Sequence, residues 1–229
     1  MSVKSYYRSI ELNNEGCGYL EYGELIFARN CFREAMQFMT VAIVEAQSEN
    51  ESILQSLDTG ERHSHLQWSA VPRVPLHVSP EAFLYQRAIV IIRNDATNGD
   101  PAPSPFELSD ESSMIVYNLG LSFHLVAIST NKAELLHEAM RFYQIAEAIR
   151  SRRAQSLMPE LLDLAIYNNM GQIEHEIVNY DRARMYFRAL KEALILFCRE
   201  GLVNFIAEQD SNGFVLNASM QEVTLAAAA

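Results

Sequence analysis

The sequence predicts an all-α fold, an array of antiparallel helix pairs (an α-solenoid) with a non-helical or β-hairpin-like insertion at about 59–108. The first observation is that Asn-x-Gly recurs within three segments of helical pattern, "LNNEGCGYL" (12–20), "VYNLGLSFH" (116–124) and "YNNMGQIEH" (167–175). The second is the spacing of small and aromatic residues after each glycine. The third is the scarcity of Gly and Pro, 9 and 7 in 229 residues, which leaves long stretches able to form helix.

Each glycine is followed by a small residue, an aromatic residue and a further small or apolar residue. The three sets are Gly16-Ala28-Phe32-Ala35, Gly171-Ala183-Phe187-Leu190 and Gly120-Ala139-Tyr143-Ala146. The steps are 12, 4 and 3 residues in the first two sets, and the third differs only in a first step that is seven residues longer. Small residues let two helix axes approach closely, and the aromatic ring fills the neighbouring groove. We therefore expect each glycine to mark the place where a second helix crosses the first.

These residues resemble the tetratricopeptide repeat (TPR) family, whose repeat is a helix pair of about 34 residues. "VYNLG" (116–120) resembles the start of its first helix, and "YDRARMYFRAL" (180–190) its second helix. The resemblance covers roughly 8–36 and 112–200. It implies a degenerate, interrupted array, because successive glycines are 104 and 51 residues apart.

The first half of the chain divides into two helices and an insertion. Helices are predicted at about 4–21 and 24–57, the second being long because it contains neither Gly nor Pro. Residues 58–80 hold three prolines and are predicted to form a loop. The β-branched residues of 82–94 favour an extended strand or hairpin, and the sequence leaves open whether this segment fills the groove of the array.

The second half is predicted to contain two further helix pairs and a terminal helix. Residues 95–108 are expected to be a polar connector, and "SDES" (109–112) supplies N-cap and acidic residues for the helix that follows. The expected helices are 111–129, 132–153, 157–177, 180–200 and a C-terminal helix within 212–229. Together they give a single domain, 1–229, divided into 1–58, 59–108, 109–202 and 203–229, the last part being a cap or tail.

Charge and cysteine content narrow the classes of partner and compartment. The net charge of −11 opposes nucleic acid and anionic membranes. The uninterrupted apolar runs are far shorter than the roughly 18 residues of a membrane span, and the N-terminus has no apolar signal region. Cys17, Cys31 and Cys198 lack CxxC spacing and indicate a reducing, intracellular compartment, the cytoplasm before an organelle. Cys31 and Cys198 are expected to be buried small apolar residues.

No motif of an enzyme is present, so the sequence predicts a non-enzymatic protein with no cofactor. His63 and His65 lie two residues apart, but no partner set with metal-ligand spacing accompanies them, and no metal site is predicted. His124 and His175 each lie four residues after a glycine, and could make a shared groove tunable in charge near pH 6–7.

The resemblance implies that the first helices of the pairs line a concave groove for a partner. The implied groove residues are Asn13, Cys17, Leu20, Tyr117, Leu121, His124, Asn168, Gln172 and His175. Asn14, Asn118 and Asn169 are instead expected to serve architecture, by bonding to backbone or to a neighbouring helix.

Two functions follow as hypotheses. The first is a scaffold or adaptor that binds a protein or peptide partner through the groove, the acidic balance favouring a basic or apolar segment. The alternative is a structural subunit of a larger complex, which contacts its partners through the 59–108 insertion and the long second helix. Trp68, in that insertion, either anchors the loop or contacts a partner.

Overall fold

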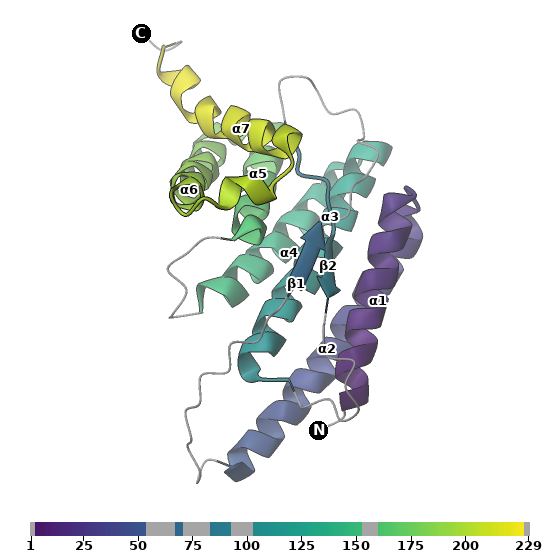
Figure 1. Ribbon diagram of the computed structural model, residues 1–229. Helices are drawn as coiled ribbons and strands as arrows, with labels where there is room; N and C mark the ends of the chain where they lie inside the picture. Colours follow the sequence, from purple (N-terminus) through teal and green to yellow (C-terminus); the bar gives the residue numbers. More distant parts are fainter. Residues whose placement is uncertain (1–2, 54–66, 71–82, 93–102, 153–159, 227–229) are drawn as a thin grey trace.

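The fold is mostly helical, as the sequence predicts, with one pair of short strands in the described residues. The computed structural model in Figure 1 describes residues 3–53, 67–70, 83–92, 103–152 and 160–226. His63, His65 and the greater part of the predicted 58–80 loop lie outside these residues.

The first helix pair is α1 (Val3–Glu21) and α2 (Leu25–Ile53), close to the predicted bounds. The turn between them places Gly23 at φ 79°, a left-handed conformation that glycine adopts without a Cβ penalty. The chain therefore reverses within three residues, and α2 returns along α1 (Figure 1).

The second pair is α3 (Pro105–Thr130) and α4 (Ala133–Ser151). The predicted start of α3 near residue 111 was wrong, because Ser104 is the N-cap and forms a reciprocal capping box with Glu107. Pro105 takes the first helical position, where its missing N–H costs nothing. Residues 105–108, expected to be connector, are the first turn of the helix.

The third pair is α5 (Leu161–Glu176) and α6 (Tyr180–Arg199), and it is followed by a short 3-10 helix (Leu202–Phe205) and by α7 (Glu208–Ala226). Arg150 of α4 joins this pair to the preceding one. Its guanidinium Nη2 lies 2.8 Å from Asp163 Oδ2 on α5, and Nη1 lies 3.9 Å from Asp110 Oδ1 on α3. This nearly buried charge cluster ties three helices together.

The recurring glycines lie where the helices of a pair touch. A Cβ at Gly16 would come within 2.7 Å of the Phe32 ring, and a Cβ at Gly171 would meet Phe187 in the same way. Gly120 faces Tyr143 of α4, at 3.1 Å from where its Cβ would be. The expectation that each glycine permits a close helix crossing is confirmed, and close packing offsets the low helix propensity of glycine.

The insertion contributes two short antiparallel strands, β1 (Gln67–Ala70) and β2 (Ile89–Ile92). Their register pairs Trp68 with Ile91 and Ala70 with Ile89. The prediction of an extended segment at 82–94 is confirmed for its described residues, 83–92, whereas the prediction of a loop over 58–80 was wrong for 67–70, which form β1. In Figure 1, β2 lies between α1 and α3, and the extended chain before it runs toward α5 and α7.

The helix α3 is buried without interruption from Asp110 to Ala127. An 18-residue window of α3 has a mean hydropathy of 1.3, so by length and composition α3 is apolar enough to cross a membrane. However, 78% of that window is buried against the rest of the protein. The core helix of a globular fold has the same properties, so this observation is weak support for a membrane span.

An asparagine ladder around an extended segment

Residues 83–92, which we call the groove segment, pass between the first helices of the pairs. Leu84, Tyr85, Ala88, Ile89 and Ile91 are each at most 4% exposed. The space between the first helices of the three pairs, which the sequence left open, is occupied by residues 83–92 of the chain itself.

At one end, α1 and α3 hold the backbone of Ile89 and Ile91. Asn14 Oδ1 accepts the Ile91 N–H at 3.0 Å, and its Nδ2 donates to Ile91 O at 2.9 Å. Asn118 does the same for Ile89, at 2.8 Å for both bonds. Asn13 adds a donor to Ile89 O at 3.1 Å and accepts from Asn118 Nδ2 at 2.9 Å. We call these three asparagines the N-terminal clamp.

At the other end, α5 and α7 hold Phe83 and Tyr85 by the same pattern. Asn169 Oδ1 accepts the Tyr85 N–H and its Nδ2 donates to Tyr85 O, both at 3.0 Å. Asn217 accepts from Phe83 N at 3.3 Å and donates to Phe83 O at 2.6 Å. Asn168 adds a donor to Phe83 O at 3.0 Å and accepts from Asn217 Nδ2 at 2.7 Å. These three asparagines are the C-terminal clamp.

The asparagine ladder is the set Asn14, Asn118, Asn169 and Asn217, one from each of α1, α3, α5 and α7. An asparagine amide carries one acceptor and two donors, so it can satisfy both the N–H and the C=O of one residue, as a neighbouring strand would. Buried backbone groups must be paired, and the ladder pairs them with side chains. The groove segment is thus bonded like a strand in a sheet, except that asparagine side chains of the helices replace the neighbouring strand along this edge.

The ladder explains why two adjacent asparagines occur in α1 and α5, whereas the ladder asparagines of α3 and α7 have no asparagine beside them. The second asparagine of each doublet holds a backbone amide, and the first bridges to the asparagine of the next helix. The doublets therefore mark the first helix of each two-helix clamp.

The other edge of the groove segment faces β1. Successive residues of a strand point their N–H and C=O groups to opposite edges. Ile89 and Ile91 face the ladder, so Val90 and Ile92 face Ser69 and Gln67, their partners in the β1–β2 register. The segment is in this way bonded on both edges over residues 89–92.

The side chains of α7 form a socket for the aromatic end of the groove segment. Tyr85 stacks on Phe214 with ring centroids 5.3 Å apart, and Phe83 meets the same ring edge-on at 5.5 Å. Gly213 leaves room for the Phe83 ring, because a Cβ there would overlap it. The helix α7, which lies within the predicted cap or tail at 203–229, therefore forms one wall of the groove.

Asp210, in the first turn of α7, forms an ion pair with Arg87 of the groove segment. Arg87 Nε lies 2.5 Å from Asp210 Oδ2, and the two side chains are 14% and 10% exposed. Desolvation raises the pKa of Asp210, and the Arg87 charge and hydrogen bond oppose that rise. The Asp210 carboxylate is thus largely shielded from solvent and paired with the Arg87 guanidinium.

All but one of the predicted groove residues are buried. Eight have at most 1% exposure, namely Asn13, Cys17, Leu20, Tyr117, Leu121, His124, Asn168 and Gln172. His175 is half-buried, and the centroid of its ring lies 5.3 Å from the centroid of the Tyr180 ring. The backbone of Trp68 lies in β1. With the groove segment in place, the eight buried residues are not presented to a partner.

Three ladder residues, Asn14, Asn118 and Asn169, were assigned to architecture, and two functional residues were missed altogether. The bond to backbone was foreseen, but the backbone is that of the groove segment. Asn217 was missed although "VLNAS" (215–219) follows the pattern of "VYNLG", with serine in place of glycine. Asp210 had no signal in the sequence, because only the fold brings it to Arg87.

The proposal of a groove charge tunable near pH 6–7 was wrong for His124. Burial lowers the pKa of His124 to about 3, so its ring stays neutral in that range. Its Nδ1 lies 3.4 Å from the Tyr143 hydroxyl, whereas Nε2 has no hydrogen-bond partner. The amide of Gln172 is also buried without a partner at either atom.

The cysteines differ in exposure more than the sequence suggested. Burial raises the pKa of the Cys17 thiol, which lies 3.5 Å from Ile89 O beside the N-terminal clamp. Cys31 is half-buried and Cys198 is exposed, so the expectation that both are buried was wrong. Position 198 lies on the outer face of α6 rather than on its packed face.

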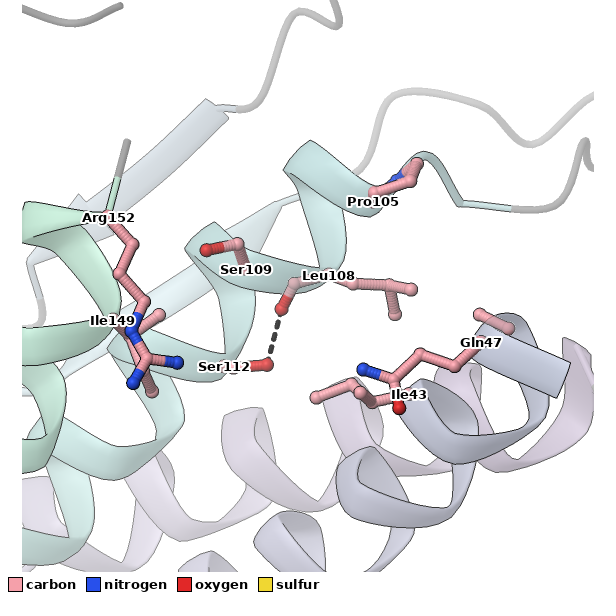
Figure 2. A pocket seen from close by; sticks show the side chains of 9 residues that line it. Ile43, Gln47, Pro105, Leu108, Ser109, Ser112, Ile149 and Arg152 are labelled. Atoms are coloured by element: carbon pink, nitrogen blue, oxygen red, sulfur yellow. Dashed lines mark hydrogen bonds between the residues drawn. The ribbon is translucent and has the colours of Figure 1, made fainter. Parts of the chain in front are cut away.

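A separate cavity of about 290 Å³ lies between the end of α2, the start of α3 and the end of α4 (Figure 2). Its lining residues are Ile43, Ala46, Gln47, Pro105, Leu108, Ser109, Ser112, Ile149 and Arg152. The walls are largely apolar, and none of the lining residues belongs to the asparagine ladder.

Among the described residues, no group of three His, Cys, Asp or Glu side chains could hold a metal ion. In comparisons with known proteins, no family model, no curated protein and no solved structure matches this chain. Its function must therefore be argued from the groove itself.

Proposed function

We propose that this chain is a non-enzymatic, TPR-like interaction module whose groove binds an extended polypeptide segment by its backbone. The observation that carries the proposal is the asparagine ladder, four side-chain amides that each hold one residue by both N–H and C=O. Backbone recognition of this kind gives affinity that is independent of the bound sequence. A partner would be a protein or peptide that supplies such a segment.

The groove segment then acts as a tethered occupant. A tethered segment competes at an effective concentration on the order of 1 mM. A free peptide of equal intrinsic affinity displaces half of it only near that concentration. Partner binding through the groove therefore requires a better-fitting segment, or an event that weakens the tethered one.

Hydrogen exchange at the backbone amides of Tyr85, Ile89 and Ile91 tests this proposal. An exchangeable segment opens locally, so these amides should exchange with a free energy of opening well below that of global unfolding. The buried amides of α3 provide the reference for global unfolding. Exchange of both sets at the same rate over a range of denaturant would make the groove segment a permanent core element and would refute groove binding.

The second candidate function is a subunit of a larger complex that contacts partners through the insertion and α2. One observation favours it, because α2 carries exposed apolar side chains in its first turn and again past its middle. Ile26 and Phe27 are 61% and 57% exposed, and Val41 and Val44 are 46% and 55% exposed. Exposed apolar groups of this kind are common at interaction sites.

Co-purification of partners with variant chains separates the two candidates. A Phe27→Ser, Val44→Ser chain removes the outer apolar groups of α2 and should leave the ladder intact. Loss of a partner from this variant, with retention by an Asn217→Ala chain, supports the second candidate. The opposite pattern supports the groove.

A further inference from the structure

The clamps alone give the groove no sequence preference. Both contact only the N–H and C=O of the groove segment, and every residue other than proline carries these groups. Selectivity for a partner must come from the places where side chains of the segment meet the groove walls.

Three such places are filled in the present structure. Tyr85 lies on the Phe214 ring, Ile89 and Ile91 are buried between α1 and α3, and Arg87 meets Asp210. The aromatic and aliphatic places select by size and apolarity, where one methylene changes affinity only modestly. The Asp210 place selects by charge.

Of the three places, Asp210 should discriminate most strongly among side chains, because burying a carboxylate without a partner costs free energy. With Arg87 present, the two side chains are only 14% and 10% exposed and lie 2.5 Å apart. A segment with a neutral side chain at this place would leave the carboxylate buried alone, and an acidic one would add repulsion. The position of Asp210 in the first turn of α7 favours its ionised form.

We propose that the groove accepts a segment of a partner protein with an aromatic residue, a basic residue two positions later and aliphatic residues two and four positions after that, and that Asp210 reads the basic residue. This inference rests on the proposed function. It adds a position-specific requirement for a cation to the general expectation of a basic or apolar partner.

The probe is a fluorescein-labelled peptide of residues 81–94, EAFLYQRAIVIIRN. The full chain is opened by Arg87→Glu, which sets two carboxylates against each other and expels the tethered segment while leaving Asp210 unchanged. Fluorescence anisotropy should show that the opened chain binds the peptide at least about tenfold more tightly than the unaltered chain, whose groove is filled.

The discriminating comparison uses two variant peptides of equal charge. The Arg87→Glu peptide should bind the opened chain at least about tenfold more weakly than the parent peptide, whereas the Arg93→Glu peptide should stay within about twofold. In a chain opened by Tyr85→Ser and Ile89→Ser, an added Asp210→Lys should reverse the preference toward the Arg87→Glu peptide. Equal binding of all three peptides refutes the reading of charge by Asp210 and leaves the proposed function standing.

Absence of binding by every peptide refutes the proposed function itself. If an opened chain is unfolded, recovery of its helical circular dichroism on addition of the parent peptide, and not of the Arg87→Glu peptide, supports the proposal, and lack of recovery counts against it. A concentration-dependent dimer of the opened chain would identify a second copy as the occupant and would overturn the proposal of a separate partner.

Discussion

The two clamps use one hydrogen-bond pattern but hold different side chains. The N-terminal clamp holds two isoleucines that are 1% and 2% exposed, with β1 along the opposite edge. The C-terminal clamp holds Phe83 and Tyr85 against the rings and the glycine of α7, beside a charge pair. Under the proposed function, this difference separates recognition of the backbone, which both clamps share, from selection by side chains, which would be concentrated at the α7 end.

The largest expected effect is that of Asn118→Ala in the N-terminal clamp. The substitution removes the acceptor of the Ile89 N–H and the donor to Asn13 Oδ1, and both of these groups are buried in the centre of the fold. We expect a loss of about 4 kcal/mol in the free energy of unfolding, measured by urea titration. Asn217→Ala is the matched variant and should cost less, because α7 packs mainly against α6, whereas α3 packs against α1, α2 and α4. Equal losses in the free energy of unfolding would contradict this difference between the two clamps.

Gly213→Ala should break the α7 socket selectively. Its Cβ would overlap the Phe83 ring, so either the ring or α7 must move. We expect about 2 kcal/mol of destabilisation, within the usual range for overpacking. Gly18→Ala in α1 is the control, because a Cβ there meets no atom within 4 Å, and it should stabilise by up to about 1 kcal/mol. An unchanged melting temperature for Gly213→Ala would contradict the described fit.

Acid should destabilise the fold through His124, in the central helix α3. Burial lowers the pKa of its folded state to about 3, below the ordinary value of 6.5, so only the unfolded chain takes up this proton between those values. Stability contributed by the neutral ring is fully present above pH 6.5 and is lost as the pH falls toward 3, at up to about 1.4 kcal/mol per pH unit. Denaturant titrations between pH 7 and pH 4 measure this slope.

His124→Gln should flatten that part of the profile. His175→Gln replaces the half-buried histidine at the corresponding position of α5 and should keep the acid loss of the unaltered chain. If His124→Gln leaves the slope unchanged, the acid sensitivity arises elsewhere.

The smallest expected effect is at the bridging asparagines. Asn13→Leu removes one donor to Ile89 O, but that carbonyl keeps its bond from Asn118 at 2.8 Å. We expect a cost of about 1 kcal/mol or less, and a similar cost for Asn168→Leu at the opposite clamp. Thermal melts of the two variants compare the clamps directly. A cost several times larger for one of them would show that its bridge is essential.

The helix pairs were predictable because their packing is local in sequence. The glycine and the aromatic residue that meets it lie at a regular spacing, as Gly16 and Phe32 do. The groove segment was predictable as an extended stretch from its β-branched residues. Its place between the helices was left open, because the Asn118–Ile89 contact depends on how separate helix pairs stack. The Arg87–Asp210 pair joins residues 123 positions apart and leaves no local pattern.

The ladder also has a consequence for solubility. Residues 88–92, AIVII, contain neither charge nor proline, and such stretches stack readily into cross-β fibrils when their edges are free. Side-chain amides on helices saturate one edge without offering a new strand edge beyond it, so the sheet cannot grow in that direction. The asparagines thus keep this edge from pairing with a strand of another chain. A partner that replaces the groove segment would have to keep residues 88–92 from being exposed during the replacement.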